Sequence, residues 1–117
     1  MPRHQETVQV SPTDDGFIAI DVHRKYDDGV EYRSKLYFQR ADATKLADAV
    51  ERFTRTPVDD SVDLVDGVVH LFPQERGDMI NVELTRDGAL PHGGYDTLDF
   101  GPATAPAIIA GLRQHAS

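Results

Sequence analysis

Two stretches of this chain decide its fold: FIAIDVHR at residues 17–24 and MINVELTR at residues 79–86. In each stretch apolar and polar residues alternate, which is the pattern of a β-strand with one buried face. The stretches begin 62 residues apart, and at that offset four positions agree in type: Ile18 with Ile80, Ile20 with Val82, Val22 with Leu84, and Arg24 with Arg86. One strand pattern repeated at a fixed distance indicates an internal duplication.

The same offset extends the match toward both ends of the chain. LYFQRADA at residues 36–43 falls on LDFGPATA at residues 98–105. ETVQVS at residues 6–11 falls on VVHLFP at residues 68–73. Few residues are identical, so the alternative is a chance agreement between two unrelated units, each of strands followed by a helix.

The first half of the chain predicts a long β-hairpin. Residues 17–23 and 30–39 alternate in polarity, and Asp28-Gly29 between them supplies the positive φ angles that a tight turn favours. One face of the second strand is apolar and consists of Val30, Tyr32, Leu36 and Phe38. We therefore expect one face of the hairpin to lie against the core and the other to face solvent.

Each half ends in an amphipathic helix. The stripe of the first helix consists of Leu46, Ala47, Val50 and Phe53. That helix should end at Thr56-Pro57, because a residue before proline avoids the helical conformation. The second helix is expected over residues 104–115, with a stripe of Ile108, Ile109 and Leu112. Asp42 and Thr104 coincide at the 62-residue offset, and both are candidate N-caps whose side-chain oxygens would accept N–H groups of the first turn.

The second half also predicts strands. Asp66-Gly67 lies between two short apolar runs within residues 62–73, which is a strong signal for a hairpin. Residues 79–85 and 95–100 are expected to form two further strands, separated by a loop that contains glycine and proline.

Together these elements predict an α+β fold: two tandem βββα units packed with pseudo-twofold symmetry, forming an antiparallel sheet with two helices. The units span approximately residues 6–55 and 62–117, and the second gains an extra strand at residues 62–65. A chain of 117 residues has room for one core, so we expect a single domain over residues 1–117. The order of elements is similar to that in the repeats of the Whirly and Pur single-strand-binding families, but the sequence carries no signature motif of either, so we do not assign the chain to them.

Composition excludes several classes of protein. The chain has no cysteine, which rules out disulfides, thiolate nucleophiles and cysteine-ligated metals. Its formal net charge is −8, and an acidic surface repels nucleic-acid phosphates. No apolar run is long enough for a membrane span and no signal peptide is evident, so we expect a cytoplasmic protein. The preference for Arg over Lys suits a high-GC bacterial or phage genome, and the abundance of aspartate offers salt adaptation as the alternative.

Motifs for catalysis and for metal binding are missing from the sequence. It contains no nucleophile elbow, no phosphate-binding glycine loop and no zinc-like spacing of its five histidines. The acidic run DDSVDLVD at residues 59–66 departs from a calcium-binding loop, because Leu64 stands at the glycine position and His70 at the final glutamate position. We therefore expect no catalysis, no cofactor and no metal site.

The first hairpin carries the candidate binding residues. Basic and aromatic side chains gather on its sequence, and we expect them together on its outer face: Arg24, Tyr26, Arg33, Lys35 and Tyr37, with Lys25 and Arg40 nearby. Cations interleaved with rings are typical of surfaces that bind single-stranded nucleic acid. The alternative is an ordinary polar sheet face with cross-strand ion pairs, such as Arg33 with Asp21.

A second candidate site is the loop RDGALPHGGY, which joins two predicted strands at residues 86–95. Its glycines would allow a ligand to approach the backbone closely. His92 is the candidate acid or base if this loop binds a small ligand or performs chemistry.

Three hypotheses about function follow. The first is a small acidic module that binds a protein partner without catalysis, as a phage or mobile-element accessory or inhibitor protein would. The alternative is a single-stranded nucleic-acid-binding protein that uses the Arg/Lys/Tyr face, and the second alternative is a small-ligand binder or enzyme at residues 86–95. We also predict a homodimer, since twofold pairing is the commonest symmetric assembly.

Overall fold

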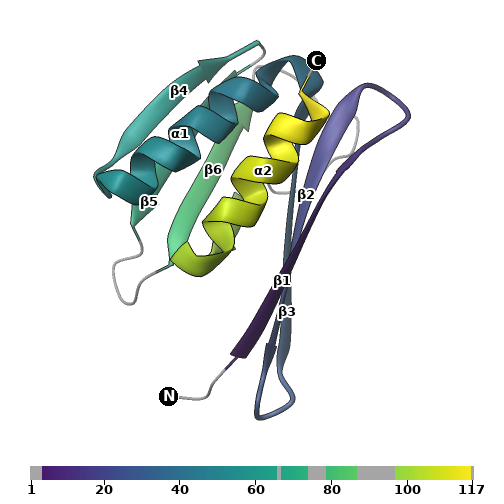
Figure 1. Cartoon of the computed structure of the whole chain (residues 1–117), viewed down its shortest axis with the longest axis vertical. Coiled ribbons are helices and arrows are strands. Elements are labelled where there is room, and N and C mark those ends of the chain that lie inside the picture. Colours follow the sequence, from purple (N-terminus) through teal and green to yellow (C-terminus); the bar gives the residue numbers. More distant parts are fainter. Residues whose placement is uncertain (1–3, 66, 74–78, 87–96, 117) are drawn as a thin grey trace.

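The computed structural model describes residues 4–65, 67–73, 79–86 and 97–116 of the chain, and their fold is α+β, as predicted. Two antiparallel sheets contain the strands (Figure 1). Sheet A has the order β1-β2-β3 and consists of β1 (His4–Pro12), β2 (Phe17–Tyr26) and β3 (Glu31–Gln39). Sheet B has the order β4-β5-β6-β7 and consists of β4 (Asp60–Leu64), β5 (Gly67–Pro73), β6 (Ile80–Arg86) and β7 (Thr97–Phe100).

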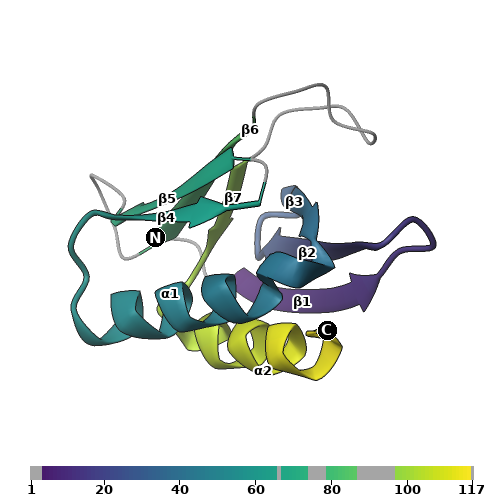
Figure 2. The ribbon, with the colours of Figure 1, turned by 90° about the horizontal axis from the view of Figure 1, so that it is seen from above.

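Two helices, α1 (Ala43–Arg55) and α2 (Ala105–His115), lie side by side in one layer, with the strands on the other side of that layer (Figure 2). Each follows a short 3₁₀ turn: η1 (Arg40–Asp42) precedes α1, and η2 (Pro102–Thr104) precedes α2. Helix α1 contacts β4 and β5, whereas α2 contacts β1. The helix of each half thus packs against strands of the other half.

The two predicted βββα units match the observed order of strands and helices. At the offset of 62 residues, Ile18 pairs with Phe38 in sheet A as Ile80 pairs with Phe100 in sheet B. The 3₁₀ turns and the starts of the helices coincide at the same offset. The extra strand of the second unit is β4, which begins two residues before the predicted range.

The first strand of each unit departs from that overlay. Val8 pairs with Val22, and Val69 pairs with Leu84, so the first strands correspond at an offset of 61 residues while their partners correspond at 62. The match of residues 6–11 with residues 68–73 was therefore wrong by one residue. A one-residue slip exchanges the two faces of a strand, and the overlay would have turned His70, which is exposed, toward the core.

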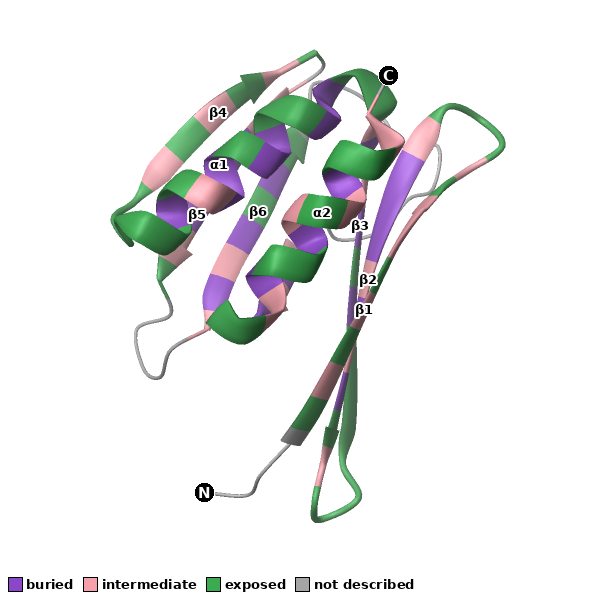
Figure 3. Ribbon diagram, in the orientation of Figure 1, coloured by how far each residue is buried: buried purple, intermediate pink, exposed green. Residues whose placement is uncertain are grey.

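The core lies between the helices and the inner faces of both sheets. Every second residue along β2 and β6 is buried, at Ile18, Ile20, Val22 and Arg24 and at Ile80, Val82 and Leu84, and the buried side of each helix faces the strands (Figure 3). The largest side chains with almost no exposed surface come from both units: Phe38, Phe100, Ile18, Ile20, Leu36, Leu46, Leu71, Leu98, Ile108 and Leu112. Burial of apolar area from both units in one cluster is the main source of stability.

The turns differ in detail from the prediction. The β2–β3 hairpin closes with the N–H of Tyr26 donating to Val30 O at 2.9 Å, which leaves a loop of three residues. In that loop Gly29 alone has a positive φ, of 89°, whereas we had predicted positive φ at Asp28 as well. The β4–β5 hairpin is present, with Leu64 paired to Gly67, although Asp66 itself lies outside the described residues.

The two predicted N-caps do not act as caps. Asp42 and Thr104 both have helical backbone angles, because each is the last residue of a 3₁₀ turn, and neither side chain caps its helix. The side-chain oxygens make tertiary contacts instead. Asp42, fully buried, accepts the backbone N–H of Val65 at 3.1 Å, and the Thr104 hydroxyl donates to Glu6.

One end of sheet A, where β2 turns into β3, extends past the helices (Figure 1). Residues 27–33 along this projection are all exposed. No helix in the described part of the chain is long and apolar enough to cross a membrane.

Candidate binding face of sheet A

The outer face of sheet A is the face turned away from the helices, and it carries the odd-numbered residues of the three strands. Inner-face residues, such as Ile20 and Leu36, are buried in the core. On the outer face, Thr7, Gln9 and Arg33 are exposed. The β-pleat therefore presents a polar surface to solvent, as the alternation predicted.

Arg24 and Tyr26 do not lie on that face, which corrects the expectation from the sequence. Both continue the even-numbered series of Ile18, Ile20 and Val22 on the inner side of β2. Arg24 is only 4% exposed. Its Nη2 lies 2.8 Å from Oε2 of Glu6, and its Nη1 lies 3.3 Å from Oδ2 of Asp99 in β7. Arg24 is thus part of a buried ion-pair network that joins sheet A to sheet B.

Glu6 is the centre of this network. Its carboxylate accepts hydrogen bonds from Arg24, from the Thr104 hydroxyl and, at 2.9 Å, from the backbone N–H of Gly101. Burial alone would raise the pKa of Glu6, but these hydrogen bonds together hold that pKa below its ordinary value. Sequence reasoning missed Glu6 and Asp99. The signal was the position of Arg24 in the same alternating series as Ile18, Ile20 and Val22, because a charged side chain on the buried face of a strand needs buried partners.

The outer face places polar side chains in rows across the strands. Thr7 lies opposite His23, and His23 lies opposite Arg33. In the next row, Asp21 lies opposite Lys35. The predicted cross-strand pairing of Arg33 with Asp21 was therefore wrong by one row. The turn brings Tyr26 beside Val30, and counting back along both strands from there places His23 opposite Arg33.

A hollow of about 400 Å³ opens on this face, lined by Thr7, Gln9, Asp21, His23 and Arg33 together with Val8. Nε2 of His23 lies 3.5 Å from Oε1 of Glu31, and this buried nitrogen forms no hydrogen bond with the described residues. The hollow thus combines hydrogen-bonding groups of several kinds with one guanidinium.

Lys35 and Tyr37 flank the hollow on β3, and Lys35 Nζ lies 5.1 Å from the centre of the Tyr37 ring. A hydrogen bond with Tyr37 raises the pKa of Lys35, with a further contribution from the charge of Asp21. These contacts favour the charged form of Lys35, and Asp21 partly balances that charge on the same face.

Arg33 differs from the other arginines. Five other arginines each form a hydrogen bond or an ion pair: Arg24, Arg40, Arg52, Arg55 and Arg113. Among the arginines whose side chains the structure describes, Arg33 is the one without such a partner. An unpaired guanidinium in a chain of net charge −8 is the most distinctive chemical feature of this face.

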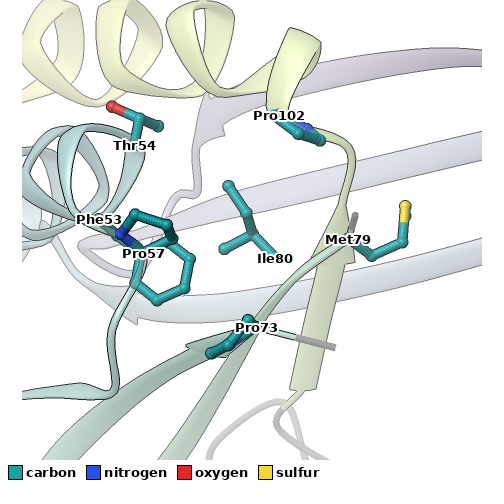
Figure 4. A pocket seen from close by; sticks show the side chains of 7 residues that line it. All are labelled: Phe53, Thr54, Pro57, Pro73, Met79, Ile80 and Pro102. Atoms are coloured by element: carbon teal, nitrogen blue, oxygen red, sulfur yellow. The ribbon is translucent and has the colours of Figure 1, made fainter. Parts of the chain in front are cut away.

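A second, apolar pocket lies at the C-terminal end of α1 (Figure 4). Its volume is about 360 Å³. The lining comes from four separate segments of the chain: Phe53, Thr54 and Pro57; Pro73; Met79 and Ile80; and Pro102. Sequence reasoning did not anticipate this pocket, because only the packing of the two units brings these segments together.

The remaining candidates lie elsewhere. His92 and all of the 86–95 loop except Arg86 fall outside the described residues. A hollow of about 230 Å³ beside sheet B is bordered by four polar residues, Asp59, Asp60, His70 and Glu83. Within the described ranges, no three His, Asp or Glu side chains are grouped closely enough to hold a metal ion.

Comparison with known proteins adds little. No protein-family model matches the chain, and no curated protein matches it. A crystal structure of Trypanosoma brucei MRP1/MRP2 is similar over 98% of this chain and 84% of that chain, with 14% sequence identity and a TM-score of 0.48.

Proposed function

We propose that this chain is a non-catalytic binding module that docks an acidic segment of a protein partner on the outer face of sheet A. The observation that carries the proposal is the unpaired guanidinium of Arg33 in the polar hollow. A guanidinium binds a carboxylate with two parallel hydrogen bonds, which provide direction as well as charge. Gln9 and Thr7, in the same hollow, offer donors and acceptors for a peptide backbone.

The charges of the face favour isolated carboxylates over a continuous polyphosphate. Asp21 and Glu31 lie on the same face as Arg33 and would repel successive phosphates. The net charge of −8 adds to this repulsion. One of the two aromatic rings expected to stack on bases, that of Tyr26, belongs to the inner side of the hairpin. A protein partner can place its carboxylates beside Arg33 and neutral groups beside Asp21.

Binding to a defined probe tests the proposal. The probe is a fluorescein-labelled peptide of alternating glutamate and serine, titrated with the chain and followed by anisotropy. Arg33→Glu should weaken binding at least about tenfold, because a charge-assisted hydrogen bond contributes about 1.5–3 kcal/mol. Lys45→Glu is the matched control, since Lys45 is an exposed cation on α1 and its reversal gives the same net charge.

If the proposal is correct, only Arg33→Glu weakens binding of the peptide, and Lys45→Glu binds it within about twofold of the unchanged chain. Equal weakening by both variants would mean that only the overall charge matters. No binding of the peptide by the unchanged chain would also overturn the proposal.

Single-stranded nucleic acid remains the second candidate, and one observation favours it. Arg33, Lys35 and Tyr37 alternate on one face of β3, which combines cations with a ring. This candidate predicts salt-sensitive binding of a labelled oligothymidylate that is lost in the Arg33→Ala/Tyr37→Ala double variant. Unchanged oligonucleotide binding in the double variant would exclude this face as the nucleic-acid site.

A further inference from the structure

The C-terminal ends of the two helices occupy corresponding places in the two units but differ in chemistry. At the 62-residue offset, Phe53 of α1 corresponds to His115 of α2, and Pro102 of η2 corresponds to Arg40 of η1. The apolar pocket lies at the end of α1. Comparison with the end of α2 shows which group is missing from that pocket.

At the end of α2, an arginine of the chain binds the helix terminus. Nε of Arg40 donates a hydrogen bond to the carbonyl oxygen of His115 at 2.7 Å. The last carbonyls of a helix have no partner within the helix, and the negative end of the helix dipole favours a cation there. Arg40 satisfies both requirements.

At the end of α1, the corresponding carbonyl is that of Phe53, and it lacks such a donor. Within the helix its donor would be the N–H of residue 57, but Pro57 has none. The N–H of Thr56 donates to Arg52 O at 3.0 Å instead. Pro102 replaces the arginine and has no side-chain donor. Among the described residues, no donor satisfies the Phe53 carbonyl.

We propose that the pocket at the end of α1 binds an arginine side chain of a protein partner. The guanidinium would donate to the Phe53 carbonyl, as Arg40 does to His115, and its aliphatic stem would lie along the apolar lining. Figure 4 shows Phe53, Pro57, Pro73 and Pro102 arranged around Ile80. The three proline rings have few conformations to lose, so binding costs little ordering of the pocket.

Volume and charge agree with this occupant. The pocket holds about 360 Å³, within the range of about 300–1,000 Å³ that is typical of small-ligand sites. A long side chain with an apolar stem and a charged head suits an apolar pocket beside the last turn of a helix, where backbone carbonyls lack donors within the helix. Arginine suits it better than lysine, because a guanidinium is less strongly hydrated than an ammonium. The site does not involve the outer face of sheet A, so either proposal can fail alone.

The first test uses three short peptides and the ¹⁵N-labelled chain. Acetyl-Gly-Arg-Gly-amide should shift the amide resonances of Phe53, Thr54 and Ile80. The lysine peptide should bind more weakly. The citrulline peptide, which has nearly the same shape but no charge, should bind at least about fivefold more weakly than the arginine peptide, since charge-assisted hydrogen bonds are roughly twice as strong as neutral ones. Equal binding of the arginine and citrulline peptides would overturn the proposal, and so would the absence of shifts at these residues.

The second test builds the missing arginine into the chain. The residues before the two positions have similar backbone angles, φ −70° and ψ 141° at Gln39 against φ −75° and ψ 153° at Gly101, so Pro102→Arg should be accommodated. This variant should abolish binding of the arginine peptide, whereas Pro102→Ala should retain it. A folded Pro102→Arg variant that binds the peptide unchanged would contradict the proposal. If Pro102→Arg does not fold, the arginine, lysine and citrulline peptides are compared on Pro102→Ala, and equal binding of the arginine and citrulline peptides there would overturn the proposal.

Discussion

Arg24 lies on the buried side of β2 because its position continues the alternation of Ile18, Ile20 and Val22. The alternation is visible in the sequence. The prediction placed Arg24 on the outer face because it grouped the basic residues of the hairpin by their closeness in sequence. Its partner Glu6 could not be identified in the same way. Eighteen residues and a strand pairing separate the two, and only the register of β1 with β2 places Glu6 opposite Arg24.

Glu6→Gln tests the network at the level of one residue. The amide keeps the shape of the side chain but removes the charge that balances Arg24. We expect the free energy of unfolding to fall by about 1.5–3 kcal/mol, the range for hydrogen bonds to charged groups. Urea denaturation at neutral pH measures the change. A change of a few tenths of a kcal/mol would show that Asp99 alone balances Arg24.

The same residue predicts a pH dependence. Because the pKa of Glu6 is lower in the folded chain than its ordinary value of 4.5, the unfolded chain binds its proton first. The stabilisation from Glu6 is therefore fully present above that ordinary value and is lost as the pH falls through the lower, folded pKa. The difference in stability between the unchanged chain and Glu6→Gln should shrink in this acidic range. A difference that stays constant down to pH 2 would contradict the assignment.

Gly111 provides a second test at a single position. Replacing glycine by alanine within a helix usually stabilises it by up to about 1 kcal/mol. At Gly111, however, an added Cβ would lie 2.7 Å from Cβ of Val10, where α2 crosses β1. We expect overpacking, which costs about 1–3 kcal/mol, to outweigh the helical preference. A higher melting temperature for Gly111→Ala would show that the helix and strand can move apart easily.

At the scale of elements, the alternation of polarity located strands in both sheets, since each sheet has one buried and one exposed face. It predicted residues 17–23 for β2 and residues 79–85 for β6, close to the observed bounds. The prediction failed at the helix starts. An aspartate before an apolar stripe is typical of an N-cap, but the sequence does not reveal the 3₁₀ turn that gives Asp42 helical angles and directs its carboxylate to Val65.

Asp42→Ser distinguishes the two roles of that residue. Serine is as good an N-cap as aspartate, so a capping role would leave stability nearly unchanged. Serine is too short to reach the N–H of Val65 in the same way, and we expect a loss of about 1.5–3 kcal/mol, the range for a hydrogen bond to a charged group. Thermal unfolding of the two proteins provides the measurement. Equal melting temperatures would restore the capping interpretation.

At the scale of the whole molecule, the two units depend on each other, because the helix of each unit packs against strands of the other unit. The internal repeat was visible in the sequence, but its packing was not, because a 62-residue periodicity does not show which sheet each helix covers. Contacts of α1 with sheet B and of α2 with β1 give the answer. The buried residues of both helices and both sheets form one common cluster, so neither unit has a separate core.

A fragment of residues 1–59 should therefore be unfolded alone, since α1 would lack β4 and β5 and β1 would lack α2. The fragment of residues 60–117 should behave in the same way, and an equimolar mixture should regain helical circular dichroism. The intact chain should unfold in a single transition. A cooperative thermal transition in either isolated fragment would contradict the interdependence of the units.

The central claim is that an acidic protein segment binds beside Arg33 on the outer face of sheet A. The most direct measurement is a ¹H–¹⁵N titration of the intact chain with the alternating glutamate–serine peptide. We expect the resonances that shift to belong to the hollow, at Thr7, Gln9, Asp21, His23 and Arg33, with α1 and α2 unaffected. Shifts confined to other surfaces, or none at saturating peptide, would contradict the claim.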